Sequence, residues 1–281
     1  MTHERLPVTK SRRIAIAALA LGATVLCATA VTAGAPGREC AVTAQAVYAV
    51  DHASGKIVCV KNARMKLHPA STVKLLTALV VLERRAVTDE VWVSSRAARV
   101  EPTRAGLTEG ASHSVAELLA LLLATSANDA AVALAEAVAG TEDEFAGLMN
   151  RKARELGMTD SHFTNATGLP DRSQRASARD LATLTRVAFR HPFIATVMGE
   201  KRVTITGSDG KTISRTNHNK LLWYLDHPRV LGKTGYTRSA RHCYAGVAYY
   251  DDRRVSVVIL KSQRPWTDIY SLLGVPRKAK R

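Results

Sequence analysis

The chain has 281 residues, 46% of them hydrophobic and 23% charged, so it can bury one large core or two small ones. Its net charge of +16, from 40 lysines and arginines against 24 aspartates and glutamates, favours polyanionic partners through charge alone. Nucleic acid is excluded because aromatic and basic residues are not interleaved in a chain that begins like an exported protein, which leaves anionic wall polymers, a membrane surface or a merely solvated basic surface.

The first 35 residues have the pattern of an export signal, with basic residues followed by an apolar run from Ile14 to about Ala33. The run is longer than the ~7–15 residues of a usual cleaved signal and close to the ~20 that span a bilayer. Cleavage and retention as an N-terminal anchor therefore both remain open, and a cut after Ala30 or Ala33 is favoured because a proline follows Ala35. Either way, the rest of the chain is expected outside the cytoplasm, secreted or attached to the outer face of the membrane.

Apart from Cys27 inside the apolar run, the chain has three cysteines, an odd number for an oxidising compartment: Cys40, Cys59 and Cys243. We give equal weight to two alternatives: one disulfide with a free thiol, and no disulfide at all. The sequence does not determine which cysteines would pair.

Residues 42–50 and 57–60 suit two strands joined by a turn. The motif Ser71-Thr72-Val73-Lys74 then begins an apolar run to residue 84, which predicts a fully buried helix. Ser71 and Lys74 share a helix face, and desolvation in such a helix lowers the pKa of a lysine. A neutral amine beside a hydroxyl is a general base, so we predict Ser71 as a nucleophile and Lys74 as its base.

The alternative for this motif is a helix-capping serine with a surface lysine. The spacing alone does not decide, because Ser208-Asp209-Gly210-Lys211 has it too. That second copy lies on a predicted hairpin turn between strands 202–206 and 212–216, where neither group is desolvated. Context therefore favours Ser71 over Ser208.

Helices are predicted at 115–124, 128–138, 142–156 and 178–190, with glycines between several of them. The motif Ser126-Ala127-Asn128 falls between the first two. A hydroxyl at Ser126 would pass protons between Lys74, Ser71 and a leaving amine, and Asn128 would hydrogen-bond a substrate amide and the lysine. Helix capping, for which Ser and Asn are preferred residues, is the alternative.

Strands return at 230–233, 243–250 and 254–261, before a closing helix at 265–273. Strands at both ends of the chain with helices between them predict an α+β fold, in which both halves complete one sheet and a helical block is inserted.

The motif Lys233-Thr234-Gly235 lies on one of these strands, at the edge of the sheet. Its cation and hydroxyl suit a free carboxylate, and its glycine leaves room for a substrate. An ordinary edge strand with a solvated lysine is the alternative. A phosphate loop is excluded because Ile205 and His227 stand where its earlier glycine would be. The sequence contains neither HExxH nor CxxC, and its nine histidines lack metal-ligand spacing, so neither a metal nor another cofactor is expected.

With these motifs in place, the chain resembles the serine-type D-Ala-D-Ala carboxypeptidases, the low-molecular-mass penicillin-binding proteins. The resemblance runs from about residue 44 to 273 and includes the stretches 149–150, 156–158, 163–165, 168–170 and 217–222. It implies a DD-peptidase/β-lactamase-like fold, a five-stranded antiparallel sheet flanked by helices. It also implies a single catalytic domain over 36–281, with a helical lobe at about 85–200, and any tether at the N-terminus.

The resemblance implies removal of the terminal D-Ala from peptidoglycan stem peptides, and hence a part in cell-wall synthesis and cell shape. Ser71 would form an ester with the penultimate D-Ala, while the backbone N–H groups of Ser71 and Tyr236 hold the oxyanion. Lys233, Thr234 and Thr237 would hold the terminal carboxylate. β-Lactam antibiotics would acylate the same serine, because their strained amide and carboxylate imitate the peptide end.

The sequence departs from the family at Ala240-Arg241-His242, because in the family Ala-Gly often precedes the cysteine that is Cys243 here. This departure leaves the substrate preference open.

Two other functions remain as alternatives. A β-lactamase of the same fold needs a deacylating base, and the sequence has no Glu-x-x-Leu-Asn after the second motif. A catalytically weak penicillin-binding or wall-associated protein would not require the intact motif set.

Overall fold

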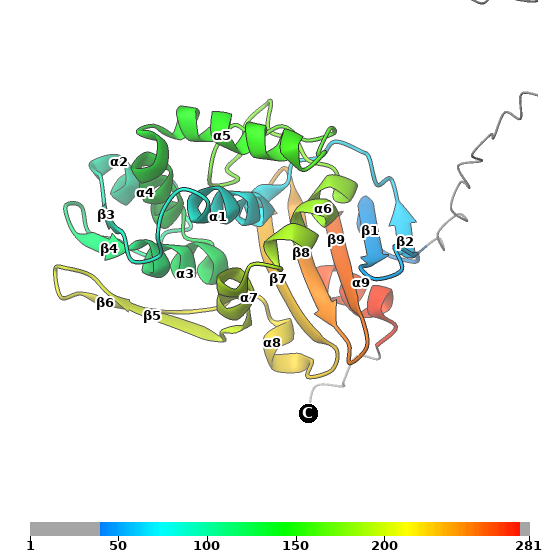
Figure 1. Cartoon of the computed structure of the whole chain (residues 1–281). Coiled ribbons are helices and arrows are strands. Elements are labelled where there is room, and N and C mark those ends of the chain that lie inside the picture. The colour runs from blue at the N-terminus through cyan, green and yellow to red at the C-terminus, as the bar shows by residue number, and fades with distance from the viewer. Residues whose placement is uncertain (1–39, 276–281) are drawn as a thin grey trace, which may run out of the picture. The chain divides into compact units, whose positions relative to one another are not determined.

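The two ends of the described chain meet in one antiparallel sheet, as the sequence predicts. The computed structural model describes residues 40–275, so the expected export signal and the last basic residues lie outside the described residues. The sheet has the strand order β2-β1-β9-β8-β7 (Figure 1). Its strands are β1 (Ala46–Asp51), β2 (Ile57–Lys61), β7 (Arg229–Thr237), β8 (Arg241–Tyr249) and β9 (Arg254–Ser262). The predicted fold class, α+β with a five-stranded antiparallel sheet, is confirmed.

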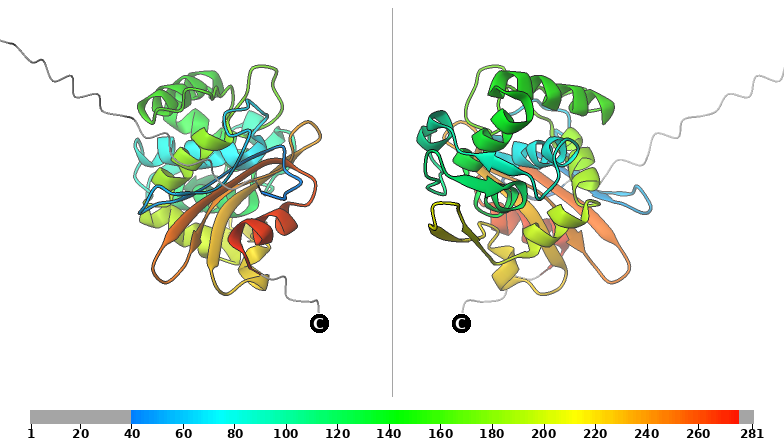
Figure 2. Two further views of the ribbon diagram at one scale, coloured as in Figure 1. Left: turned by 90° about the vertical axis from the view of Figure 1, so that its right-hand side faces the viewer. Right: turned by 60° about the vertical axis from the view of Figure 1, so that its left-hand side comes forward.

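Both faces of this sheet are buried, which explains why β8 and β9 are almost continuously apolar. Successive side chains of a strand point to opposite faces. Ala245 and Val247 thus join the core that contains the inserted helices, whereas Tyr244 and Ala248 join a second core. Helix α6 (Ala178–Ala188) packs on the first face, and α9 (Pro265–Leu273) covers the other (Figure 2).

Helix α1 (Lys74–Leu82) is buried along nearly its whole length, which confirms the prediction from its apolar sequence. A short 3₁₀ turn, η1 (Ala70–Val73), precedes it and carries Ser71. Helix α1 contacts α3, α4, α5 and α6, so it is the element on which the inserted helices pack (Figure 1). The inserted elements are β3 (Glu90–Trp92), α2 (Ser95–Arg99), β4 (Ser112–Ser114), α3 (Val115–Thr125), α4 (Asn128–Ala139) and α5 (Glu142–Glu155).

Three further elements lie between α6 and β7. Helix α7 (Pro192–Gly199) follows α6, the strands β5 (Arg202–Thr206) and β6 (Thr212–Thr216) form a hairpin, and α8 (Leu221–Tyr224) is a single turn. The hairpin has the predicted bounds. The predicted helix 178–190 is too long, because the chain turns before Pro192, and the sequence reading missed α7.

A disulfide joins Cys40 to Cys59, and Cys243 is a free, buried thiol. The bridge ties the start of the described chain to β2, an edge strand of the sheet. Within residues 40–275, no helix has the length and apolar character that a bilayer crossing requires.

Reduction of the Cys40–Cys59 disulfide is expected to lower the free energy of unfolding by about 3 kcal/mol, because it frees a loop in the unfolded chain. The two cysteines are 19 positions apart. Urea unfolding with and without a reductant measures the difference, and Cys243→Ala should show the same loss on reduction. An unchanged unfolding midpoint in the reduced protein would contradict the expectation.

Candidate active site

The structure brings the three sequence motifs together around Ser71. Lys74 Nζ lies 3.2 Å from Ser71 Oγ and 2.7 Å from Asn128 Oδ1. A cavity of about 330 Å³ is lined by residues from all three motifs. The predicted site residues that line it are Ser71, Ser126, Thr234, Gly235 and Tyr236.

The other predicted residues lie next to this catalytic cavity or beyond it. Lys74 and Asn128 are buried behind Ser71, and Lys233 is buried within β7. Thr237 does not line the cavity, since its hydroxyl accepts a hydrogen bond from the Ala240 N–H at the end of β7. His242 does line it, and its ring stands 4.7 Å from that of Tyr236, so the departure from the family pattern lies at the rim.

Burial favours the uncharged form of Lys74. The side chain is fully buried, and this desolvation, together with the charge of Lys233, lowers its pKa well below 10.5. The carboxylates of Glu142 and Asp129 act in the opposite direction and raise the pKa. Desolvation is the largest of these effects, so the free amine is favoured.

A free amine has two N–H groups and one lone pair. Around Lys74, each of these three has one hydrogen-bond partner. The Thr167 carbonyl and Asn128 Oδ1 accept the two N–H groups. The lone pair is then left for the Ser71 hydroxyl, which can donate its proton across 3.2 Å. The same hydroxyl is 3.4 Å from the Thr167 carbonyl oxygen, a longer contact. The arrangement suits proton transfer from Ser71 to Lys74.

The orientation of Asn128 is fixed by its other hydrogen bonds. Its side-chain amide donates to the Glu101 carbonyl at 2.8 Å, and its backbone N–H donates to the Thr103 carbonyl at 2.7 Å. The amide oxygen therefore faces Lys74. The next residue, Asp129, is fully buried and accepts hydrogen bonds from three successive backbone N–H groups of the loop 105–107 at 2.8–3.1 Å.

Ser126 does not cap a helix through its side chain. It ends α3 in the left-handed conformation, with φ 66°, and α4 begins after Ala127 without a side-chain cap. The capping alternative for this motif is therefore wrong for Ser126. Its buried Oγ has no hydrogen-bond partner among residues 40–275, and it lines the cavity with Ser71. A buried hydroxyl without a partner costs about 1–3 kcal/mol, so a substrate group that hydrogen-bonds it would remove this cost.

Two glycines allow close packing around the backbone of Ser71. Gly168 has φ +84°, and a Cβ there would collide with the backbone of Ala70. A Cβ on Gly235 would lie 2.9 Å from the Ser71 nitrogen. Glycine at these two places therefore lets the loop 164–169 and strand β7 approach the serine from two sides.

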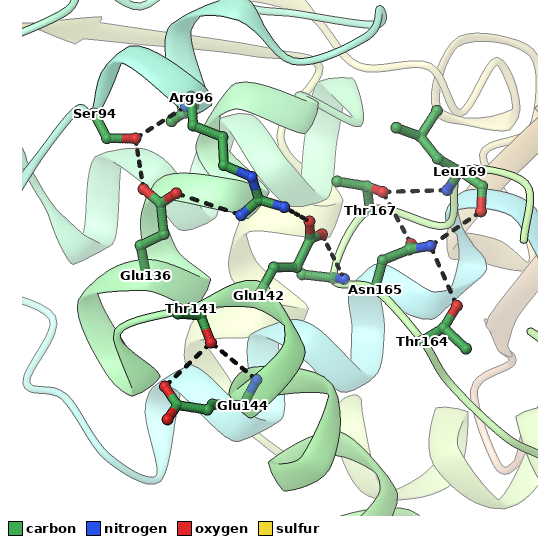
Figure 3. A network of polar contacts seen from close by, with 12 residues as sticks. Ser94, Arg96, Glu136, Thr141, Glu142, Glu144, Thr164, Asn165, Thr167 and Leu169 are labelled. Atoms are coloured by element: carbon green, nitrogen blue, oxygen red, sulfur yellow. Dashed lines mark hydrogen bonds and ion pairs between the residues drawn. The ribbon is translucent and has the colours of Figure 1, made fainter.

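The Thr167 carbonyl is held by an anchored loop (Figure 3). Asn165 Oδ1 accepts from the Thr167 hydroxyl at 2.9 Å and from the Gly168 N–H at 2.8 Å. Glu142 Oε1 accepts from the Ala166 N–H at 3.0 Å, and its other oxygen pairs with Arg96 at 2.7 Å. The Glu142 carboxylate thus links the start of α5 and the side chain of Arg96 on α2 to the loop that holds Lys74.

Lys233 and His218 also have altered acid–base properties. Burial lowers the pKa of Lys233 to about 7, and its Nζ donates to the Thr234 carbonyl at 3.0 Å. Burial, followed by the charges of Lys233 and Lys74, lowers the pKa of His218 to about 4. His218 is therefore neutral at physiological pH, and it lines the catalytic cavity.

The second Ser-x-x-Lys sequence is structural. Ser208 Oγ accepts from the Ser112 N–H at 2.8 Å, and Lys211 Nζ donates to the Gly106 carbonyl at 2.6 Å, so neither group faces the other. As for metals, the described part of the chain holds no group of three His, Cys, Asp or Glu side chains placed to bind an ion.

Sequence reasoning missed several contributors to this site. The Thr167 carbonyl belongs to the backbone, so no side-chain pattern reveals it. Glu142 and Asp129 could have been flagged as acidic residues in the first turns of apolar helices, where a carboxylate most often only favours the helix N-terminus. His218 lies inside the stretch 217–222 that carries the resemblance, but nothing in its spacing separates it from a structural histidine.

Comparison with known proteins gives consistent matches. A family model described as D-alanyl-D-alanine carboxypeptidase matches residues 29–264. The D-alanyl-D-alanine carboxypeptidase DacF of Bacillus subtilis is 31% identical, over 81% of this chain and 59% of its own length. DacB2 of Mycobacterium tuberculosis is 32% identical, over 77% of this chain and 74% of its own. The chain thus spans little more than half the length of DacF, and 56% of that of Escherichia coli DacC.

Solved structures agree with the fold. A D-alanyl-D-alanine carboxypeptidase from M. tuberculosis superposes with a TM-score of 0.77 at 28% identity, covering 86% of this chain and 93% of its own. A putative penicillin-binding protein homologue from the same organism gives a TM-score of 0.77 at 30% identity, covering 86% and 94%.

Glu142→Ala is expected to slow acylation of Ser71 by a labelled β-lactam by at least about tenfold, because the Ala166 N–H loses its acceptor and the Thr167 carbonyl shifts. Glu142→Gln keeps an acceptor for that N–H and should lose less. Glu144→Gln is the matched control, since Glu144 lies in the same helical turn and its carboxylate has Thr141 as its one hydrogen-bond partner among residues 40–275 (Figure 3). Equal rates in all three variants would contradict a positioning role for Glu142.

Proposed function

The chain belongs to the D-alanyl-D-alanine carboxypeptidase family, and on that premise we propose that it is a serine enzyme that removes the terminal D-Ala from peptidoglycan stem peptides. One observation carries the proposal. A fully buried lysine amine, whose pKa is lowered by desolvation, lies 3.2 Å from a serine hydroxyl that lines an open cavity. That pairing supplies an activated nucleophile without a histidine.

In the proposed reaction, Lys74 takes the Ser71 proton while Ser71 Oγ attacks the carbonyl carbon of the penultimate D-Ala. The backbone N–H groups of Ser71 and Tyr236 hold the resulting oxyanion. The tetrahedral intermediate collapses to an ester, and the proton returns through Ser126 to the nitrogen of the leaving D-Ala. Water then hydrolyses the ester, with Lys74 again as the base. The partnerless hydroxyl of Ser126 supports this relay, because it is free to exchange protons within the cavity.

The terminal carboxylate is proposed to bind at the Lys233 end of the cavity, with Thr234 and Thr237 as further contacts. The buried ammonium of Lys233 supports this placement, because a carboxylate would compensate its desolvation. Asn128 and Gly235 are proposed to contact the substrate backbone. β-Lactams would form the same ester on Ser71, and we expect slow release of the product.

We also propose that residues 1–35 are an export signal or N-terminal anchor and that 36–281 form one catalytic domain, with a helical lobe at about 85–200. The protein would then act outside the cytoplasm, secreted or anchored at the outer face of the membrane. The Cys40–Cys59 disulfide supports this location, because disulfides persist in oxidising compartments. The net charge of +16 supports additional contact with anionic wall polymers or a membrane surface.

Release of D-Ala from diacetyl-L-Lys-D-Ala-D-Ala tests the proposed function. Ser71→Ala is expected to lower kcat by at least about 10⁴-fold, because the nucleophile is lost. Ser208→Ala is the matched control, since that serine has the same Ser-x-x-Lys spacing but bonds the Ser112 N–H, and it should retain full activity. A wild-type protein that releases no D-Ala, or a Ser71→Ala variant that still does, would refute the proposal.

A chromogenic cephalosporin separates the carboxypeptidase from a β-lactamase. A stoichiometric burst followed by slow turnover is expected, whereas rapid steady turnover would indicate a β-lactamase.

The pH dependence of kcat/KM should show two limbs. Activity is expected to rise as Lys74 loses its proton, at a pH well below 10.5, and to fall above about 7 as Lys233 loses the charge that binds the carboxylate. A substrate whose terminal carboxylate is methylated should lack the falling limb. A falling limb of equal size with that substrate would argue against Lys233 as the carboxylate site.

A further inference from the structure

A second cavity opens beside the catalytic one. Its volume is about 660 Å³, twice the 330 Å³ of the catalytic cavity. Thr103, His218 and Lys220 line both cavities, so the two are neighbours that share a wall. The second cavity is too large to be explained by a leaving alanine alone.

The walls of the second cavity are held by hydrogen bonds. The loop 101–107 forms one wall, fixed by the carboxylate of Asp129 and by the Asn128 N–H, which donates to the Thr103 carbonyl. Arg215, at the end of β6, donates to the Ala105 carbonyl of the same loop at 2.6 Å. Helix α8 contributes Trp223 and Tyr224 to the lining, and these residues are 39% and 60% exposed. The cavity is therefore a built feature of the fold.

The lining of this cavity is positively charged. Arg104, Arg215 and Lys220 contribute to it, and none of the described residues that line it is acidic. Each guanidinium spends only part of its five N–H donors on backbone carbonyls, so the others remain available. The Lys220 ammonium has no hydrogen-bond acceptor among residues 40–275. Such a lining favours an anionic ligand, and the exposed aromatic rings add apolar contact area.

The position of His218 relates this cavity to the reaction. His218 lines both cavities, so it lies where the catalytic cavity meets the second one. If the terminal carboxylate binds at Lys233 and Thr234, the leaving residue occupies this end of the catalytic cavity. Any group attached to the leaving residue then extends past His218 into the second cavity.

We propose that the second cavity is a leaving-group subsite that favours leaving residues carrying an additional carboxylate. The proposal rests on the proposed function, because it takes the orientation of the substrate from it. The enzyme would then cleave D-Ala from acidic D-amino acids, or from acidic peptides joined through an amine, in preference to neutral leaving groups of the same size.

Three synthetic substrates that share the same acyl group test the proposal: acyl-D-Ala-D-Ala, acyl-D-Ala-D-Glu and acyl-D-Ala-D-Gln. D-Gln has the shape of D-Glu without its charge. We expect kcat/KM for the D-Glu substrate to exceed that for D-Gln by about threefold or more, and the ratio to fall as salt is added. Arg104 lines only the second cavity, so Arg104→Gln should move the ratio toward one without changing hydrolysis of the D-Ala substrate.

Arg253→Gln is the matched control, because it removes the same charge at the turn between β8 and β9, outside both cavities. It should leave the ratio unchanged. Hydrolysis of D-Ala-D-Ala with a D-Glu to D-Gln ratio of one or less would overturn the subsite while leaving the proposed function intact. A ratio that Arg104→Gln does not alter would overturn it as well. Failure to hydrolyse all three substrates would instead refute the proposed function.

Discussion

The amine of Lys74 has to be both buried and hydrogen-bonded, and much of the structure around it follows from that requirement. An unpaired amine inside an apolar helix bundle would cost several kcal/mol, so its N–H groups need acceptors at fixed places. Those acceptors come from two other parts of the chain, the side chain of Asn128 on α4 and the backbone of Thr167. The inserted helices and the loop 164–169 therefore supply the acceptors of Lys74 as well as part of the core.

Each acceptor is held by a buried carboxylate close to it in space. Asp129 fixes the loop whose carbonyls orient Asn128, and Glu142 fixes the Ala166 N–H beside Thr167. These carboxylates have an electrostatic cost for the site, because their negative charges favour the ammonium form of Lys74. Burial and the nearby Lys233 outweigh them. The two carboxylates thus hold the acceptors in place, but they also reduce the amount by which the pKa of Lys74 is lowered.

Sequence patterns located the long elements and the chemistry-bearing side chains. The pattern of apolar residues predicted α1, α3, α4, α5 and α6, because the last four pack on α1 and each needs an apolar surface there. Most elements that escaped prediction are short: β3, α2, β4 and α8 have three to five residues, too few to show a period. The eight-residue helix α7 also escaped, because it follows α6 after only a short turn. The Cys40–Cys59 pairing depends on how the chain start lies against β2, which composition does not encode. Spacing placed Ser71 beside Lys74, but the order of hydrogen bonds around the amine needed coordinates.

Cys243 offers a way to observe motion of β7, the strand that carries Gly235 next to Ser71. Cys243 pairs with Gly235 in the β7–β8 ladder, and its thiol lies near the carbonyls of His68 and Ala240. Burial raises its pKa to about 12 and leaves the residue 2% exposed, so the thiol reacts slowly with alkylating reagents even though Cys243 lines the catalytic cavity. Because the other cysteines of the described chain are bridged, alkylation of Cys243 would report how often the strand beside Ser71 separates from its neighbours, without any introduced label.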